Sequence, residues 1–169
     1  MEKFDLQQFK SVNTKKEGRF ITAGDQHVLL RENSDSFQKD VRKPNSPLVS
    51  RKIYFKDSLH LQKEGEFLHE FPVGIHRTYD QQGKLCEEIN FDSPFSFSID
   101  SVYRKIVEQY GKNIMDTQQR LGVWRSVNPY PHYIISIPLS KNPKGDTKSI
   151  KINGETGEIE SEKILTYTK

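Results

Sequence analysis

Residues 74–91 have the sequence Gly-Ile-His-Arg-Thr-Tyr-Asp-Gln-Gln-Gly-Lys-Leu-Cys-Glu-Glu-Ile-Asn-Phe, which contains the clearest structural signal in the chain. Two short strand-like runs, 74–79 and 85–91, flank a polar connection. Asp80 can accept a hydrogen bond from the backbone ahead of it, and Gly83 can adopt the positive φ that closes a short hairpin. The stretch therefore predicts an antiparallel β-hairpin.

The chain before this hairpin has the same character, with short apolar runs between polar or glycine-bearing connections. Residues 43–47, Lys-Pro-Asn-Ser-Pro, form a loop, because proline lacks an amide donor and restricts the residue before it. Residues 23–25, Ala-Gly-Asp, favour a turn, and the first ten residues favour one or two helical turns docked by their aromatic rings. We expect strands over 20–22, 27–31, 50–55, 59–62 and 66–71.

The second half of the chain contains one strong helix signal, over residues 98–110. Ser98 is an N-cap residue type, and the apolar side chains between it and Tyr110 recur at helical spacing on one face. Gly111 supplies a C-terminal stop, because glycine enters the left-handed conformation without a steric penalty. Further strands are expected over 121–127, 133–139, 149–152 and 159–166, with turns at 128–129, 142–145 and 153–157.

These elements predict an α+β fold, in which an antiparallel β-meander is followed by one helix packed on a C-terminal antiparallel sheet. We expect residues 1–93 to form the meander with a short N-terminal segment. Residues 94–169 form the helix and the second sheet, and the two parts together form one compact unit.

Composition narrows the classes of function. The 169 residues include 26 Lys and Arg against 23 Asp and Glu, and a net charge of +3 does not indicate a dedicated nucleic-acid or membrane binder. Cys86 is the only cysteine, which excludes an intramolecular disulfide and two-cysteine metal or redox motifs. No run approaches the roughly 20 apolar residues that span a bilayer, and the first residues lack a secretory apolar core. We therefore expect a cytoplasmic protein with no membrane partner.

Residue types that could support catalysis or bind a metal lack the required spacing. The five histidines include no helical i, i+4 pair, although His60, His69 and His76 lie on successive expected strands and could converge. Cys86 is expected to be a small sheet residue rather than a nucleophile. Adjacent strand carboxylates face opposite sides, and no glycine-rich phosphate loop occurs. We expect a binding protein and not an enzyme, with no catalytic residue, cofactor or bound metal.

Two segments resemble known families. Residues 74–91 resemble the MORN-variant repeat, and residues 54–61 resemble a second copy that lacks the turn glycine. Residues 98–165 resemble a PepSY-type unit, whose closing hairpin matches Ile-Asn-Gly-Glu-Thr-Gly-Glu-Ile at 152–159. From about residue 44 onward, the joint order of these features resembles bacterial toxin-immunity proteins. The resemblance implies an immunity protein in bacterial competition, which binds and neutralises a cognate toxin delivered by a secretion system or by cell contact.

Candidate partner-binding residues lie in the C-terminal part. Trp, Tyr and Arg dominate interface hot spots, because they bury a large area and keep a polar group. The alternative for the aromatic residues, including Trp124, is that they pack the sheet onto the helix. Acidic residues of the last segment could meet a basic cleft of a nuclease toxin. The candidates are Trp124, Arg125, Tyr130, His132, Glu155, Glu158 and Glu160.

A nucleic-acid-binding module is the alternative function, with nucleic acid as the less favoured partner. Six cations lie within the basic segment 39–56. Of these, Arg42, Lys43, Arg51 and Lys52 could contact phosphates, with Tyr54 and Phe55 as stacking platforms. A peptidase-modulating role, implied by the PepSY resemblance, is a third possibility, but such units usually act outside the cytoplasm.

Overall fold

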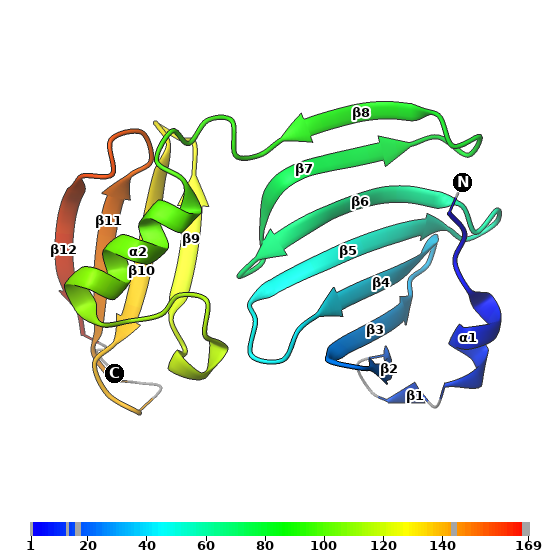
Figure 1. The fold of residues 1–169 in the computed structure, drawn as a ribbon, viewed down its shortest axis with the longest axis horizontal. Coiled ribbons are helices and arrows are strands. Elements are labelled where there is room, and N and C mark those ends of the chain that lie inside the picture. Colours follow the sequence, from blue (N-terminus) through cyan, green and yellow to red (C-terminus); the bar gives the residue numbers. More distant parts are fainter. Residues whose placement is uncertain (1, 13, 16–17, 143–144, 167–169) are drawn as a thin grey trace. The chain divides into compact units, whose positions relative to one another are not determined.

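The computed structural model describes residues 2–12, 14–15, 18–142 and 145–166. The chain divides into two compact units, Met1–Phe91 and Asp92–Lys169. Each unit contains an antiparallel sheet (Figure 1), and the fold is α+β as the sequence predicts. No helix among the described residues is long and apolar enough to cross a membrane.

The N-terminal unit is a β-meander. Its eight strands follow one another in sequence order, and each is antiparallel to the next (Figure 1). The strands are β1 (Thr14–Lys15), β2 (Gly18–Ala23), β3 (Gln26–Glu32), β4 (Ser36–Arg42), β5 (Leu48–Phe55), β6 (Leu61–Leu68), β7 (Phe71–Tyr79) and β8 (Leu85–Asn90).

The hairpin predicted over 74–91 forms β7 and β8. Asp80 Oδ1 accepts hydrogen bonds from the backbone N–H groups of Gln82, at 3.0 Å, and of Lys84, at 2.8 Å. Gly83 has a φ of 81°, in the left-handed region that favours glycine. The two residues chosen from the sequence therefore close this turn.

Strands β4 and β6 differ from the sequence-based expectation. The sequence of β4 lacks a continuous apolar alternation, because Asp40 occupies a buried position on one face. Residues 59–62 and 66–71 suggest two strands, whereas β6 is one strand with a β-bulge between Glu64 and Glu66. A bulge interrupts the period of two on which strand patterns depend.

The N-terminal segment covers one face of the meander. Helix α1 (Leu6–Ser11) begins after Asp5, whose side chain accepts a hydrogen bond from Gln8 N. The Phe4 ring stacks on that of Phe37, with centroids 4.6 Å apart and 7° between the planes. The core on this face comprises Phe4, Phe9, Val28, Leu30, Phe37, Tyr54 and Leu61.

The opposite face of the meander contains a buried ion cluster. Asp40 is 1% exposed, and its carboxylate lies 2.9 Å from Arg31 Nη1 and 2.8 Å from Arg51 Nε. Gln38 Nε2 donates to both carboxylate oxygens at 3.0 Å. The Arg51 guanidinium also lies over the Phe67 ring, at 4.6 Å from its centroid. The Asp40 carboxylate is therefore paired within the unit.

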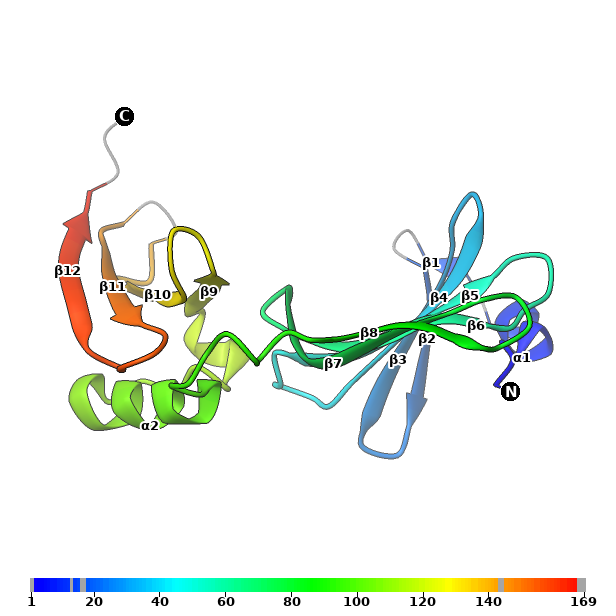
Figure 2. The same cartoon turned by 90° about the horizontal axis from the view of Figure 1, so that it is seen from above.

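The C-terminal unit is one helix on a four-stranded sheet, and Figure 2 shows helix α2 lying along one face of that sheet. The strand order is β12-β11-β10-β9. The elements are α2 (Ile99–Tyr110), the 3₁₀ turn η1 (Thr117–Gln119), β9 (Gly122–Ser126), β10 (His132–Pro138), β11 (Thr147–Asn153) and β12 (Ile159–Leu165).

Helix α2 has the boundaries that its sequence predicts. The Ser98 side chain accepts a hydrogen bond from Ser101 N, and Gly111 adopts a φ of 62° at the C-terminal end. Val102 and Ile106 of the helix are fully buried, as are Tyr133, Ile135 and Ile150 of the sheet. The expected turn over 142–145 includes residues 143–144, which lie outside the described residues.

The terminal hairpin between β11 and β12 packs on the segment that precedes α2. Phe97 N donates to Gly154 O at 2.9 Å. Gly157 has a φ of 77°, and a Cβ there would overlap the Phe97 ring. The Asn-Gly-Glu-Thr-Gly sequence therefore permits both the turn and the close approach of an aromatic side chain.

Candidate functional site

The sheet of the C-terminal unit has a helix-facing side and an opposite side with different residues. Successive strand residues face opposite sides of a sheet. In β9, Val123 is 1% exposed on the side of α2, whereas its neighbour Trp124 is 53% exposed on the other side. Trp124 pairs with Ile134 of β10, which pairs with Lys151 of β11. These three residues therefore form a row across the side opposite α2.

Gly122 allows the Trp124 ring to lie close to the sheet. A Cβ at Gly122 would overlap ring carbons of Trp124 and would lie 3.2 Å from Ser136 Cβ. The indole is therefore supported by the backbone of its own strand while about half of the residue surface stays accessible to solvent. An aromatic side chain held in place loses little conformational entropy when it binds a partner.

Tyr130, Lys151 and Glu160 form a polar cluster beside this row. Lys151 Nζ donates to the Tyr130 hydroxyl at 2.6 Å, and that hydroxyl donates to Glu160 Oε2 at 2.7 Å. Lys151 Nζ also lies 3.0 Å from Glu160 Oε2 and 4.5 Å from the Tyr130 ring centroid. We name the surface made by Trp124, Ile134, Tyr130, Lys151 and Glu160 the Trp124 face.

The hydrogen bonds of this cluster shift two pKa values. The hydrogen bond to Tyr130, and then that to Glu160, raise the pKa of Lys151. The hydrogen bond from Tyr130 lowers the pKa of Glu160, and Lys151 acts in the same direction. Both residues are therefore charged at neutral pH, and the Trp124 face combines an exposed aromatic ring with an adjacent ion pair.

The structure brings some of the predicted residues to this face. Trp124, Tyr130 and Glu160 belong to it. His132 is only 7% exposed, and its Nδ1 donates to the Tyr130 carbonyl oxygen at 2.8 Å. This hydrogen bond links the buried His132 ring to the backbone of Tyr130. The connection between β9 and β10, which contains Tyr130, includes a cis peptide bond between Asn128 and Pro129.

Arg125 is not brought to the Trp124 face. Its side chain is 5% exposed, and Nη1 lies 2.6 Å from Asp92 Oδ1. The guanidinium lies 4.8 Å from the centroid of the Phe95 ring, on the side of the sheet that faces α2. Because Arg125 follows Trp124 directly in a strand, the two side chains point in opposite directions.

Glu155 and Glu158 lie in the exposed turn between β11 and β12. The Asn153 side chain organises this turn, since its Oδ1 accepts a hydrogen bond from Glu155 N at 2.9 Å, and its Nδ2 donates to Glu160 Oε1 at 3.0 Å. The two glutamates therefore extend the acidic character of the turn next to Glu160.

Sequence reasoning missed Lys151, Ile134 and Gly122. The alternation in Ser-Ile-Lys-Ile at 149–152 contains the signal for Lys151, because it indicates one buried and one solvated face. The support that Gly122 gives to Trp124 has no such signal, since it depends on the rotamer of a side chain two residues away.

One of the two stacking platforms of the alternative hypothesis, on segment 39–56, is buried, and the other, Phe55, is half-buried. Tyr54 is 1% exposed in the core, so its ring cannot stack on a base, and this part of the hypothesis is wrong. Burial, together with a hydrogen bond to Glu2, raises the pKa of its hydroxyl. Arg51 is engaged by Asp40, and Lys52 by Glu2.

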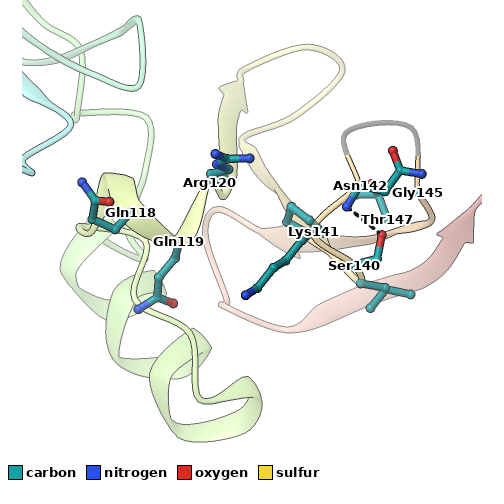
Figure 3. A pocket seen from close by; sticks show the side chains of 10 residues that line it. Gln118, Gln119, Arg120, Ser140, Lys141, Asn142, Gly145 and Thr147 are labelled. Carbon is teal, nitrogen blue, oxygen red and sulfur yellow. Dashed lines mark hydrogen bonds between the residues drawn. The ribbon is translucent and has the colours of Figure 1, made fainter.

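A polar depression of about 850 Å³ lies at one end of the C-terminal sheet (Figure 3). Arg120 follows η1 and Lys141 follows β10, and Figure 3 shows their side chains among those that line the depression. Of the described residues that line it, two are basic and none is acidic, which suits an anionic group. The loop beside the depression includes residues 143–144, which lie outside the described residues. We therefore take the Trp124 face as the candidate site.

In the described ranges, no group of three or more His, Cys, Asp or Glu side chains could hold a metal ion.

Comparisons of the chain with protein-family models, curated proteins and solved structures find no match. The resemblance to immunity proteins therefore stays a hypothesis drawn from the sequence.

Proposed function

We propose that this protein binds a partner protein through the Trp124 face, and that the partner is a cognate bacterial toxin which it neutralises in the cytoplasm. The class of partner follows from the resemblance of the chain from about residue 44 onward to toxin-immunity proteins. Binding alone inhibits a toxin when it covers the active site or holds the toxin in an inactive form.

One observation carries the proposal. Trp124 is 53% exposed, yet its ring lies directly against Gly122 of the same strand. Exposed tryptophan in a soluble protein is uncommon, and tryptophan is among the residues most enriched at the energetic centre of interfaces. A fixed, accessible indole therefore supports a binding role more directly than any other side chain on this face.

The polar cluster gives the surface a preferred partner chemistry. The Lys151 and Glu160 charges neutralise each other at 3.0 Å, whereas Glu155 and Glu158 stay exposed in the adjacent turn. The net charge contributed by these four residues at this end of the Trp124 face is therefore negative. A toxin whose active-site cleft is basic, as in a nuclease, has the complementary charge.

A co-expression assay tests the proposal. The toxin encoded beside this gene is expressed with the wild-type protein, with Trp124→Ala, and with Phe20→Ala as a matched control. Phe20 is an exposed aromatic residue of the N-terminal sheet, with 41% of its surface accessible.

We expect growth rescue by the wild type and by Phe20→Ala, and loss of rescue by Trp124→Ala at equal protein levels. Absence of rescue by the wild-type protein would refute the immunity function. Full rescue by Trp124→Ala would show that neutralisation does not use the Trp124 face.

A further inference from the structure

Strand β8 is an exposed edge of the meander. It is last in the strand order and is hydrogen-bonded to β7 alone among the described strands. All six of its residues, Leu85–Asn90, are exposed. An edge strand presents main-chain donors and acceptors on its free side, and an extended segment of another protein can pair with them.

The hydrogen bonds of the hairpin fix which groups face outward. Phe91 N donates to Gly74 O at 2.9 Å, so the N–H of residue 91 points toward β7. In an antiparallel strand, the N–H and C=O groups of one residue point to the same side and alternate along the chain. Glu88 is three residues earlier, so its N–H and C=O point away from β7, at the middle of the edge.

The side chains of β8 include two adjacent carboxylates, and only one of them makes an ion pair among the described residues. Glu88 pairs with Arg77 of β7, with 2.8 Å between Oε2 and Nε. Glu87 lies on the other face and makes no ion pair with any residue in the described part of the chain. Ile89, next to these charges, is 41% exposed.

This charge pattern opposes pairing of β8 with a second copy of itself. In a two-fold antiparallel pair of β8 strands, directly opposite residues lie on the same face, so a pair centred on Glu87 would place the Glu87 side chains of the two copies opposite each other. Like charges in directly opposite positions destabilise a sheet, whereas opposite charges stabilise it. The edge is therefore protected against self-association and stays open to a strand of opposite charge.

We propose that the β8 edge binds an extended segment of a partner protein that carries two adjacent basic residues followed or preceded by an apolar one. The basic residues lie opposite Glu87 and Glu88, and the apolar residue lies opposite Ile89. Main-chain hydrogen bonds supply affinity, and the cross-strand charge pairs supply selectivity. This surface is separate from the Trp124 face and does not depend on the proposed function.

A peptide titration followed by NMR tests the proposal on the full chain. The probe is a blocked hexapeptide, Thr-Val-Lys-Lys-Val-Thr, and the comparison peptides are its Glu-Glu counterpart and a version N-methylated at alternate amides. The readout is the backbone amide signal of Glu88. The variant Glu87→Lys is compared with Asp25→Lys, a matched charge reversal in the exposed β2–β3 turn, five strands away in the sheet order.

We expect the lysine peptide to shift the Glu88 amide signal, and Glu87→Lys to weaken its binding about fivefold. Asp25→Lys and Trp124→Ala should leave the affinity unchanged, and the glutamate and N-methylated peptides should not bind. Equal binding of the lysine and glutamate peptides, or an equal loss in Asp25→Lys, would overturn the proposal. So would binding that survives N-methylation, because it would not use the main chain of the edge.

Discussion

The two sheets differ on the faces opposite their helices, in how far charged and aromatic side chains are buried. On the meander, Asp40 is 1% exposed and is held by Arg31, Arg51 and Gln38, and the Arg51 guanidinium lies over Phe67. On the C-terminal sheet, the ion pair lies at the surface and the Trp124 ring is about half exposed. On the first face, the buried carboxylate is paired with side chains of its own unit. On the second face, the Trp124 ring stays about half exposed.

This difference predicts a structural role for the charged residues on the first face and is consistent with the binding role that we propose for the second. A buried carboxylate with two arginines stabilises the native state only while all its partners are present. An exposed ion pair contributes little to folding, so its residues can be replaced at small cost. The comparison therefore predicts large stability effects on the meander face and binding effects on the Trp124 face.

The largest expected effect is that of Asp40→Asn. The change removes the buried carboxylate charge that both Arg31 and Arg51 contact, and we expect a cost of about 3 kcal/mol in the free energy of unfolding. Urea denaturation measures it. Glu160→Gln is the matched change on the Trp124 face, and its expected cost is below about 1 kcal/mol. Equal costs in the two variants would remove the distinction between the two faces.

A smaller effect is expected from Gly122→Val. The added side chain would occupy the space of the Trp124 ring and displace the indole from the sheet, while the strand keeps its backbone pairing. We expect affinity for the proposed partner to fall by about 1–2 kcal/mol, because a tryptophan that loses its fixed position loses binding energy. Calorimetric titration measures the affinity. An unchanged affinity would show that the position of the ring is irrelevant.

The smallest effect concerns the pH dependence of the Trp124 face. The hydrogen bond from Tyr130 lowers the pKa of Glu160, so the stabilisation by this carboxylate is present above its ordinary pKa. It is lost as the pH falls from about 4.5 through the lower value of the folded state. An NMR titration should show the pKa of Glu160 rising in Tyr130→Phe. No change in that variant would contradict the hydrogen-bond assignment.

Sequence reasoning predicted the parts of the fold whose causes are local. Asp80 and Gly83 close the β7–β8 hairpin, and Ser98 and Gly111 bound α2, because turn and cap geometry depends on residues a few positions apart. Strand β4 was not predicted from the sequence, because a buried Asp40 interrupts its apolar pattern. That burial depends on arginines from β3 and β5.

The candidate site was predicted only in part, because residue type can be seen in the sequence and strand register cannot. Trp124 and Tyr130 are recognisable from residue type, but the side of the sheet that each occupies depends on strand register. Arg125 illustrates this, because its residue type favours an interface while its register directs it to the α2 side, where Asp92 pairs with it. Lys151 is distant in sequence from its partner Tyr130, so only the folded sheet brings the two together.

The most direct test of the proposed function is the dissociation constant of the proposed complex with a toxin encoded beside this gene. It is measured by calorimetry for the wild type, Trp124→Ala and Phe20→Ala. We predict that Trp124→Ala weakens binding by about 2 kcal/mol or more, about thirtyfold, with an unchanged urea midpoint, and that Phe20→Ala binds as the wild type does. Wild-type affinity in Trp124→Ala, or an equal loss in both variants, would contradict the assignment of recognition to the Trp124 face.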